Sequence, residues 1–203
     1  MAALRARTVL LTGSNRGIGL ELVKQLLGGP RPPTWIFATC RDPEGPRAQE
    51  LRDLASRHPN LVLVKLDVAN PSAIADAAKI VEGKLNGVGL NLLINNAGIY
   101  AQVSLETVDS DEMIRTYKTN AVGPLLMAQA ALNMLTKCQA LTYGEAGILC
   151  VALHPGWVKT DMGTQEADLT VDTSVRGLLS VLPVLSEKHS GNLLNWEGKV
   201  IPW

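Results

Sequence analysis

The sequence predicts a single α/β domain built on a doubly wound parallel sheet, and three observations lead to that prediction. Short apolar runs of strand length alternate with longer amphipathic segments over the first two thirds of the chain. Aromatic residues make up only 4% of the sequence, so the core must be built from Leu, Val, Ile and Ala, as in parallel sheets covered by helices. The chain of 203 residues suits one hydrophobic core better than two, which gives one domain over residues 1–203.

Each expected strand is a short apolar run, and each expected helix has apolar residues three or four positions apart. In chain order, the strands are Thr8–Leu11, Trp35–Thr39, Leu61–Leu66, Leu90–Ile94 and Ile148–Leu153. The helices are Gly17–Leu27, Pro43–Arg57, Pro71–Leu85 and Asp109–Leu141. Within the last of these, Pro124 fits only a kink or a first turn. Right-handed crossovers between these strands give a doubly wound parallel sheet, and such sheets bind their ligands at the carboxyl ends of the strands. We therefore expect a ligand at that edge.

Composition excludes several classes of function. The 19 Lys and Arg residues are balanced by 19 Asp and Glu residues, so no basic field exists to attract nucleic acid or an acidic lipid surface. No apolar run approaches the length of a membrane span, and we expect a protein that is neither anchored nor secreted. Cys40, Cys138 and Cys150 lack CxxC or metal-ligand spacing. They predict reduced thiols, a cytoplasmic location and no metal site.

A glycine-rich turn follows the first expected strand and opens the first expected helix. It reads Thr12-Gly13-Ser14-Asn15-Arg16-Gly17-Ile18-Gly19. Glycines there let the backbone turn sharply and approach a pyrophosphate at the helix N-terminus, where N–H groups and the helix dipole favour negative charge. The turn lacks the GK[ST] of an ATP-binding P-loop. It predicts dinucleotide binding, with a purely structural strand–helix corner as the alternative.

The turn resembles the TGxxxGxG motif of the short-chain dehydrogenase/reductase family, and three further motifs match that family in order. They are Asn95-Asn96-Ala97-Gly98 after the fourth expected strand, Asn120 within TYKTNAVGP, and HPGWVKTDM at 154–162. The ending GNLLNWEGKVIPW resembles the carbonyl reductases typified by sniffer and bacterial C-factor. The resemblance implies a Rossmann-like fold and an oxidoreductase that reduces a small-molecule carbonyl with a nicotinamide cofactor. It allows a homo-oligomer.

The resemblance also implies which residues contact the cofactor. They are residues 13–19 of the turn, Asp67 and Val68 at the adenine, the Asn95–Gly98 segment, and a Pro-Gly loop that holds the nicotinamide through Pro155, Gly156, Val158 and Thr160. As structure alone, Asp67 could instead cap the next helix. Asn120 is the surviving member of the family's catalytic set, in which it orders a water near a lysine.

The end of the second expected strand indicates NADP(H). An acidic residue there would bind the ribose hydroxyls of NAD, whereas arginine accommodates a 2′-phosphate. The strand ends in Arg41, and Arg16 supplies a second cation whose guanidinium suits phosphate oxygens. The alternative is that both arginines are solvated and that Asp42 binds the ribose of NAD.

The family's catalytic Ser and Tyr-x-x-x-Lys are absent. Tyr100, Tyr117 and Tyr143 are followed four residues later by Ser, Ala and Gly. Only 26 residues run from Ala121 to Ala146, where the family's remaining helix, fifth strand, catalytic loop and next helix need about 40 or more. We interpret this as an internal deletion joined near Ala130-Ala131.

The deletion removes the family's fifth strand and with it the proton donor. Either the last expected strand moves over to pair with the fourth, or a gap opens in the sheet. The sequence therefore predicts an NADP(H)-dependent reductase with impaired catalysis. The alternatives are a non-catalytic nucleotide-binding or interaction module and an unstable product without function.

Overall fold

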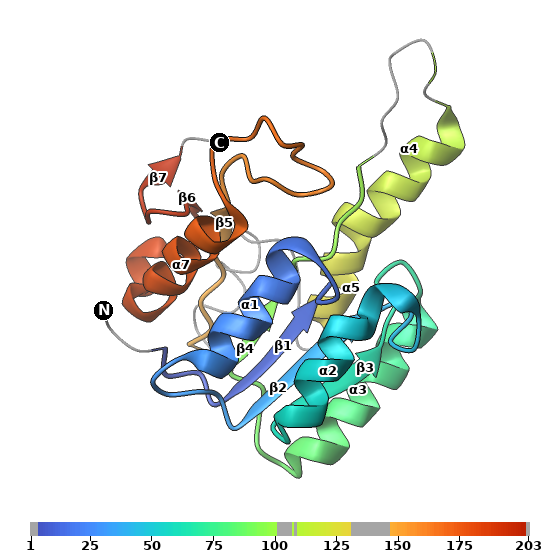
Figure 1. Ribbon diagram of the computed structural model, residues 1–203, viewed down its shortest axis with the longest axis vertical. Helices are drawn as coiled ribbons and strands as arrows, with labels where there is room; N and C mark the ends of the chain where they lie inside the picture. Colours follow the sequence, from blue (N-terminus) through green and yellow to red (C-terminus); the bar gives the residue numbers. More distant parts are fainter. Residues whose placement is uncertain (1–3, 101–106, 108, 131–146, 202–203) are drawn as a thin grey trace.

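The computed structural model describes residues 4–100, 107, 109–130 and 147–201. Its first sheet has four parallel strands in the order β3-β2-β1-β4 (Figure 1). The strands are β1 Thr8–Thr12, β2 Trp35–Cys40, β3 Leu61–Lys65 and β4 Leu92–Ile94. This arrangement confirms the predicted α/β class and the parallel sheet.

Successive side chains of β1 point to opposite faces of this sheet, and both faces are covered by helices. Val9 and Leu11 point into a buried cluster with α1 Gly17–Gly28 and α2 Gln49–Arg57, whereas Leu10 points into a second cluster with α3 Pro71–Leu85. Nearly every strand residue of β1 and β2 is buried, which accounts for their continuous apolar sequences.

Two element boundaries differ from the sequence prediction. The helix expected from Pro43 begins as a 3₁₀ turn, Pro46–Ala48, and becomes α-helical only at Gln49, because Gly45, which precedes Pro46, is extended. β4 begins at Leu92 rather than Leu90. Asn91 Oδ1 accepts hydrogen bonds from the backbone N–H groups of Arg7 and Thr8, which take the place of a strand pair.

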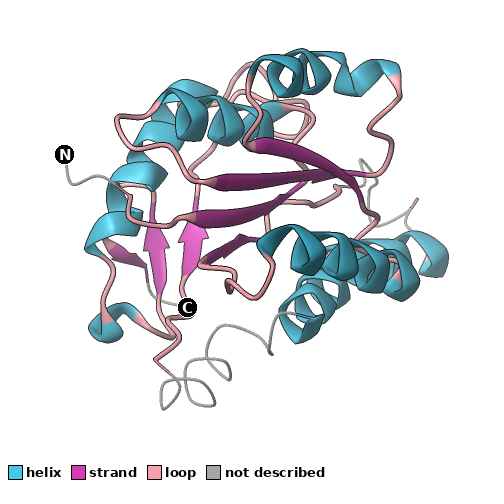
Figure 2. Cartoon of the chain, turned by 90° about the horizontal axis from the view of Figure 1, so that it is seen from below, coloured by secondary structure: helices cyan, strands magenta, loops and turns pink. Residues whose placement is uncertain are grey.

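The last third of the chain contributes a second sheet of three strands, which lies beside the first sheet (Figure 2). β5 Ala152–His154 pairs in parallel with β6 Leu193–Asn195, which pairs antiparallel with β7 Val200–Ile201. The strand expected at 148–153 is therefore shorter and begins later. Among the described residues, β4 pairs only with β1, and β5 pairs only with β6. The last expected strand has therefore not moved over to pair with the fourth, and over these residues the sheet has a gap between β4 and β5.

Helix packing holds the second sheet against the first. The helix α7 Val171–Val181 lies beside α1, and its Val175 is fully buried in the cluster that contains Val9 and Val23. Apolar burial of this kind contributes about 1.5–3 kcal/mol for each large side chain. This packing therefore contributes to holding the second sheet against the first.

The segment after Asp109 is helical as far as the structure describes it. It consists of α4 Ser110–Tyr117, a π-helical turn Lys118–Val122 and α5 Gly123–Ala130. Pro124 stands in the first turn of α5, as predicted. The rest of the expected helix, 131–141, lies outside the described residues. Among the residues that are described, no helix combines the length and apolarity that a membrane span needs.

Candidate functional site

The glycine-rich turn joins β1 to α1 at the carboxyl end of the first sheet. Gly13 has φ +68°, and a Cβ on it would lie 2.9 Å from Cα of Ala97, so only glycine fits this close approach. Gly17 also has a positive φ, of +53°. The N-terminus of α1 has no side-chain cap and no acidic residue in its first turn. Its positive end is therefore available to an anionic group.

Ser14 fastens the turn to β2. Its hydroxyl is fully buried, donates to the Leu11 carbonyl at 2.9 Å and accepts from the Thr39 N–H at 3.1 Å. Its own N–H donates to the Thr39 carbonyl at 2.9 Å. Asn15 reaches the same side, where its Nδ2 donates to the Arg47 carbonyl. Ser14 thus fixes the shape of the turn, with its hydroxyl satisfied inside the protein.

The Asn95–Gly98 segment is hydrogen-bonded directly to the turn. Asn96 Nδ2 donates to the carbonyls of Thr12 at 3.0 Å and Gly13 at 3.1 Å. The Thr12 hydroxyl in turn accepts the N–H groups of Asn96 and Ala97 at 3.1 and 3.0 Å. Thr12 is thus a site residue that the sequence prediction did not assign a role, although its hydroxyl stands at the start of the motif.

Asn120 closes the other end of that segment. Its Nδ2 donates to the Ile99 carbonyl at 2.7 Å, and its Oδ1 accepts the Ile99 N–H at 2.9 Å. Both polar atoms of the Asn120 side-chain amide are therefore hydrogen-bonded to the backbone of Ile99. Asn120 is solvent-exposed and lies beside Gly98.

Asp67 and Val68 follow β3 at the same edge. Asp67 Oδ1 accepts the Ala69 N–H at 2.9 Å, while the N-cap of α3 is Asn70. The alternative in which Asp67 caps the helix is therefore wrong. Val68 is 6% exposed, and a Cβ on Gly123 would lie 2.7 Å from its carbonyl oxygen, so α5 passes close by.

The Pro-Gly loop follows β5 and is supported from beneath. Ser174 of α7 is fully buried and donates its hydroxyl to the Pro155 carbonyl at 2.7 Å. The Gly156 N–H donates to His154 Nδ1 at 3.0 Å. Trp196 lies between Gly156 and Gly177 of α7, where a Cβ on either glycine would collide with its neighbours. The loop is thus packed against the second sheet and α7.

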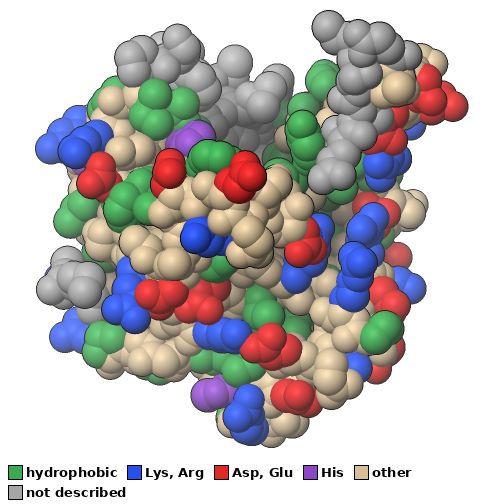
Figure 3. Space-filling model, turned by 45° about the horizontal axis from the view of Figure 1, so that its top comes forward, with side chains coloured by type: hydrophobic (Ala, Val, Ile, Leu, Met, Phe, Trp, Pro, Cys, Tyr) green, Lys and Arg blue, Asp and Glu red, His purple; other side chains and the backbone are tan. Residues whose placement is uncertain are grey.

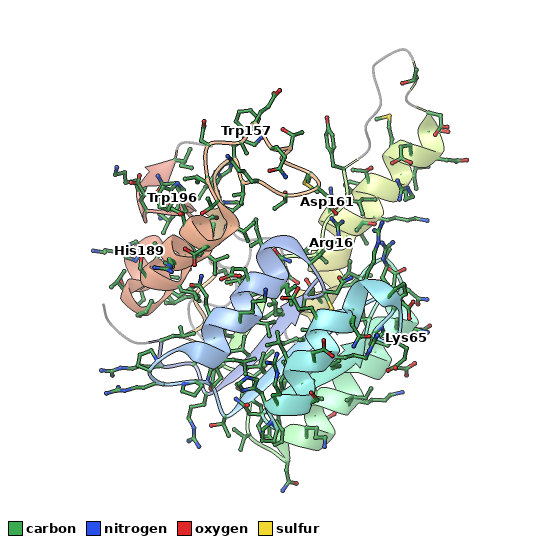
Figure 4. All side chains as sticks on the ribbon, in the orientation of Figure 1. Arg16, Lys65, Trp157, Asp161, His189 and Trp196 are labelled. Carbon is green, nitrogen blue, oxygen red and sulfur yellow. The ribbon has the colours of Figure 1, made fainter. Side chains whose placement is uncertain are left out.

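Residues 157–163 continue this loop toward the glycine-rich turn. Thr160 Oγ1 accepts the Gly163 N–H at 3.1 Å and donates to the buried Val158 carbonyl at 3.3 Å. A Cβ on Gly17 would lie 3.5 Å from Thr160 Cγ2. Figure 4 shows Asp161 of this loop beside Arg16 of the turn. The two predicted halves of the site are therefore brought together, although they come from different sheets.

Charges at this edge are mixed. Arg41 follows β2 and has no ion pair among the described residues, and Lys65 ends the neighbouring strand β3 opposite Cys40. Burial raises the pKa of the Cys40 thiol, which keeps it protonated near neutral pH. Basic and acidic side chains are intermixed on the face in Figure 3. Over the described ranges, no group of three His, Cys, Asp or Glu side chains is placed to hold a metal ion.

Comparisons with known proteins identify the family. The model of the short chain dehydrogenase family matches residues 7–135. A crystal structure of an NADPH-bound carbonyl reductase from chicken fatty liver is 48% identical, with a TM-score of 0.94 over 98% of this chain and 100% of that one. Carbonyl reductase Sniffer of D. melanogaster is 34% identical, with a TM-score of 0.93 over the same shares.

A bacterial relative gives the same result from sequence. C-signal of Myxococcus xanthus is 32% identical over 154 aligned positions, which cover 56% of this chain and 93% of C-signal. These matches agree with the motifs at 12–19 and 95–98 and with the arrangement of the first sheet. The chain therefore belongs to the short-chain dehydrogenase/reductase family, in which it is similar to the sniffer-like carbonyl reductases.

Proposed function

We propose that this chain binds NADP(H) and is an oxidoreductase of the carbonyl-reducing type whose catalysis is impaired. The observation that carries the proposal is the junction of the uncapped α1 N-terminus, Gly13 and the Asn96 segment at the carboxyl end of the first sheet. This is where parallel α/β sheets bind dinucleotides. The NADPH-bound chicken relative, which is 48% identical, supports the choice of cofactor.

The described residues fit the adenosine and pyrophosphate half of NADP(H). Residues 13–19 would hold the pyrophosphate at the uncapped N-terminus of α1, where Gly13 and Gly17 adopt the positive φ values that this turn needs and that favour glycine. Asp67 and Val68 would flank the adenine. Arg41, free of ion pairs within the described ranges, would bind the 2′-phosphate.

The nicotinamide half would lie against the Pro-Gly loop. Pro155 and Gly156 are fixed by Ser174 and Trp196, so they present a shaped surface to the ring, and Val158 and Thr160 continue it. When bound, the cofactor supplies a hydride. No Tyr-x-x-x-Lys exists in the chain to give a carbonyl oxygen its proton, and this absence is what impairs catalysis.

An internal deletion explains the absence. The alignment with C-signal has 154 positions but covers 56% of the 203 residues, which is about 114 residues, so about 40 positions are not filled by this chain. The gap between β4 and β5 lies where a fifth strand would stand. Both observations support a lost segment, and we place the join near Ala130-Ala131.

The rest of the proposal concerns substrate and location. A small-molecule carbonyl would be the substrate of any residual activity. Cys40 and Cys150 are free thiols, which agrees with a reducing cytoplasmic compartment. A non-catalytic nucleotide-binding or interaction module is the second candidate, and the missing proton donor favours it over a fully active enzyme.

Titration of the purified chain with NADPH, followed by fluorescence, tests the proposal. We expect saturable NADPH binding together with slow NADPH oxidation in the presence of reactive quinones and aldehydes. Binding without any turnover would identify the non-catalytic module. Absence of binding by a chain that melts cooperatively would overturn the proposal.

Arg41→Asp tests the cofactor preference. The change replaces the proposed partner of the 2′-phosphate with a repelling charge, so we expect the ratio of the NADH to the NADPH dissociation constant to fall at least about 10-fold. Arg31→Asp makes the same charge change at an exposed position before β2, at the opposite end of the sheet, and should leave the ratio unchanged. An unaltered ratio in Arg41→Asp would contradict the assignment.

A further inference from the structure

An ion pair connects the two halves of the proposed cofactor site. Arg16 is the residue that precedes α1 in the glycine-rich turn, and its Nη1 lies 2.7 Å from Oδ2 of Asp161. Asp161 belongs to the loop after β5, 145 residues further along the chain. Figure 4 shows the two side chains meeting above the turn. The pair therefore crosses from the first sheet's site to the loop carried by the second sheet.

The backbone holds Asp161 in this position. Thr160, the preceding residue, is fixed by hydrogen bonds of its hydroxyl to the Gly163 N–H and the Val158 carbonyl. Its methyl group lies 3.5 Å from where a Cβ of Gly17 would stand, which sets the loop against the turn. Asp161 is therefore presented to Arg16 by a loop whose shape is supported by the hydrogen bonds of Thr160.

The ion pair directs the Arg16 side chain toward the loop after β5. Ser14 and Asn15, the two residues before Arg16, face β2 and the loop after it, through bonds to Thr39 and to the Arg47 carbonyl. Arg41 lies on that side, at the end of β2. Arg16 and Gly17 instead face the loop at 160 and 161. Of the two arginines expected to bind the 2′-phosphate, one is thus already engaged by a carboxylate.

We propose that Asp161 is a specificity-determining residue, which lowers the preference for NADPH over NADH by competing with the 2′-phosphate for Arg16. This inference rests on the proposed function. NADH has no 2′-phosphate and does not require Arg16 to leave Asp161, whereas NADPH gains its contact with Arg16 only when the pair opens. The discrimination between the two nucleotides is therefore smaller than the two arginines together would give.

Exposure limits the size of the effect. The side chains of Arg16 and Asp161 are 46% and 76% exposed, and exposed ion pairs are weak. A phosphate carries a larger charge than a carboxylate and forms bidentate contacts with guanidinium, so it can displace Asp161. We expect the competition to cost about two- to five-fold in NADPH affinity.

Asp161→Asn tests the proposal by fluorescence titration with NADPH and NADH. The change keeps the shape of the side chain and removes its charge. The ratio of the NADH to the NADPH dissociation constant should rise about two- to five-fold. Glu166→Gln removes a charge from the same loop at an exposed residue that makes no ion pair within the described ranges, and it should leave the ratio unchanged.

A second pair of variants tests whether the effect passes through Arg16. In an Arg16→Gln background, adding Asp161→Asn should not change the ratio, because the residue that Asp161 competes for is gone. An unchanged or lower ratio in Asp161→Asn alone would overturn the inference, and so would an equal rise in Glu166→Gln. Failure of the wild-type chain to bind either nucleotide would instead overturn the proposed function itself.

Discussion

Insertion of the family's Ser and Tyr-x-x-x-Lys segment between Ala130 and Ala131 should raise carbonyl reduction about 10²–10⁴-fold. That range is the usual contribution of one positioned general acid. The three missing groups act as a unit, so their separate contributions do not multiply. The present chain would retain slow turnover, because the Pro-Gly loop can still hold the nicotinamide near a carbonyl that water protonates.

The measurement is NADPH oxidation with reactive quinones and aldehydes, comparing the two chains at equal concentration. A third chain carries the same insertion with its tyrosine replaced by phenylalanine. This control restores the helix and strand without the proton donor, so it should remain slow. If all three rates were equal, another donor would be responsible. Tyr100, which follows the Asn95–Gly98 segment and is 64% exposed, would be the first to test.

Gly19→Ala should abolish detectable NADPH binding and lower the melting temperature. A Cβ on Gly19 would overlap the carbonyl oxygen of Gly13 and lie 2.7 Å from Asn96 Nδ2. These are backbone and hydrogen-bonded atoms that cannot move aside without opening the turn. Overpacking of this kind costs about 1–3 kcal/mol, which lowers Tm by several degrees in a chain of this size.

Gly28→Ala is the matched control, because it lies in the same helix with nothing within 4 Å of its added Cβ. Alanine there should leave Tm unchanged or raise it slightly, since it reduces the freedom of the unfolded chain. NADPH titration and thermal melts of both variants provide the comparison. Binding by Gly19→Ala as strong as that of Gly28→Ala would show that the pyrophosphate does not use this turn.

Local sequence signals were enough to predict most of the first sheet. β1, β2 and β3 lie within a residue of their expected ends, because each is a continuous apolar run bounded by turn residues. The helix Pro71–Leu85 has its expected bounds, since Asn70 caps it and Pro71 fits its first turn. The glycine-rich turn is likewise recognisable from its neighbours in sequence.

Features that depend on distant contacts could not be predicted. The Arg16–Asp161 pair and the bond from Ser174 to Pro155 join segments that periodicity does not relate. Trp196 is an isolated aromatic in the sequence, and only the fold shows that it packs between Gly156 and Gly177. From the sequence, two ways to close the sheet stayed open, because strand pairing between β4 and β5 depends on contacts that local patterns do not report. In the structure, the two sheets are not paired across the gap between β4 and β5 over the described residues, and α7 packs on α1.

The gap between β4 and β5 changes what a bound dinucleotide would do for the protein. Its adenosine half would rest on loops of the first sheet and its nicotinamide half on the loop after β5, so the ligand would span two sheets that no strand pairing joins among the described residues. The bound dinucleotide would therefore hold the two sheets together. At 100 times its dissociation constant a ligand stabilises the folded state by about 2.7 kcal/mol. Here that stabilisation would add to the packing of α7 on α1, so amide exchange in β5, β6 and β7, the strands of the smaller sheet, would slow more on cofactor binding than exchange in β1 and β2.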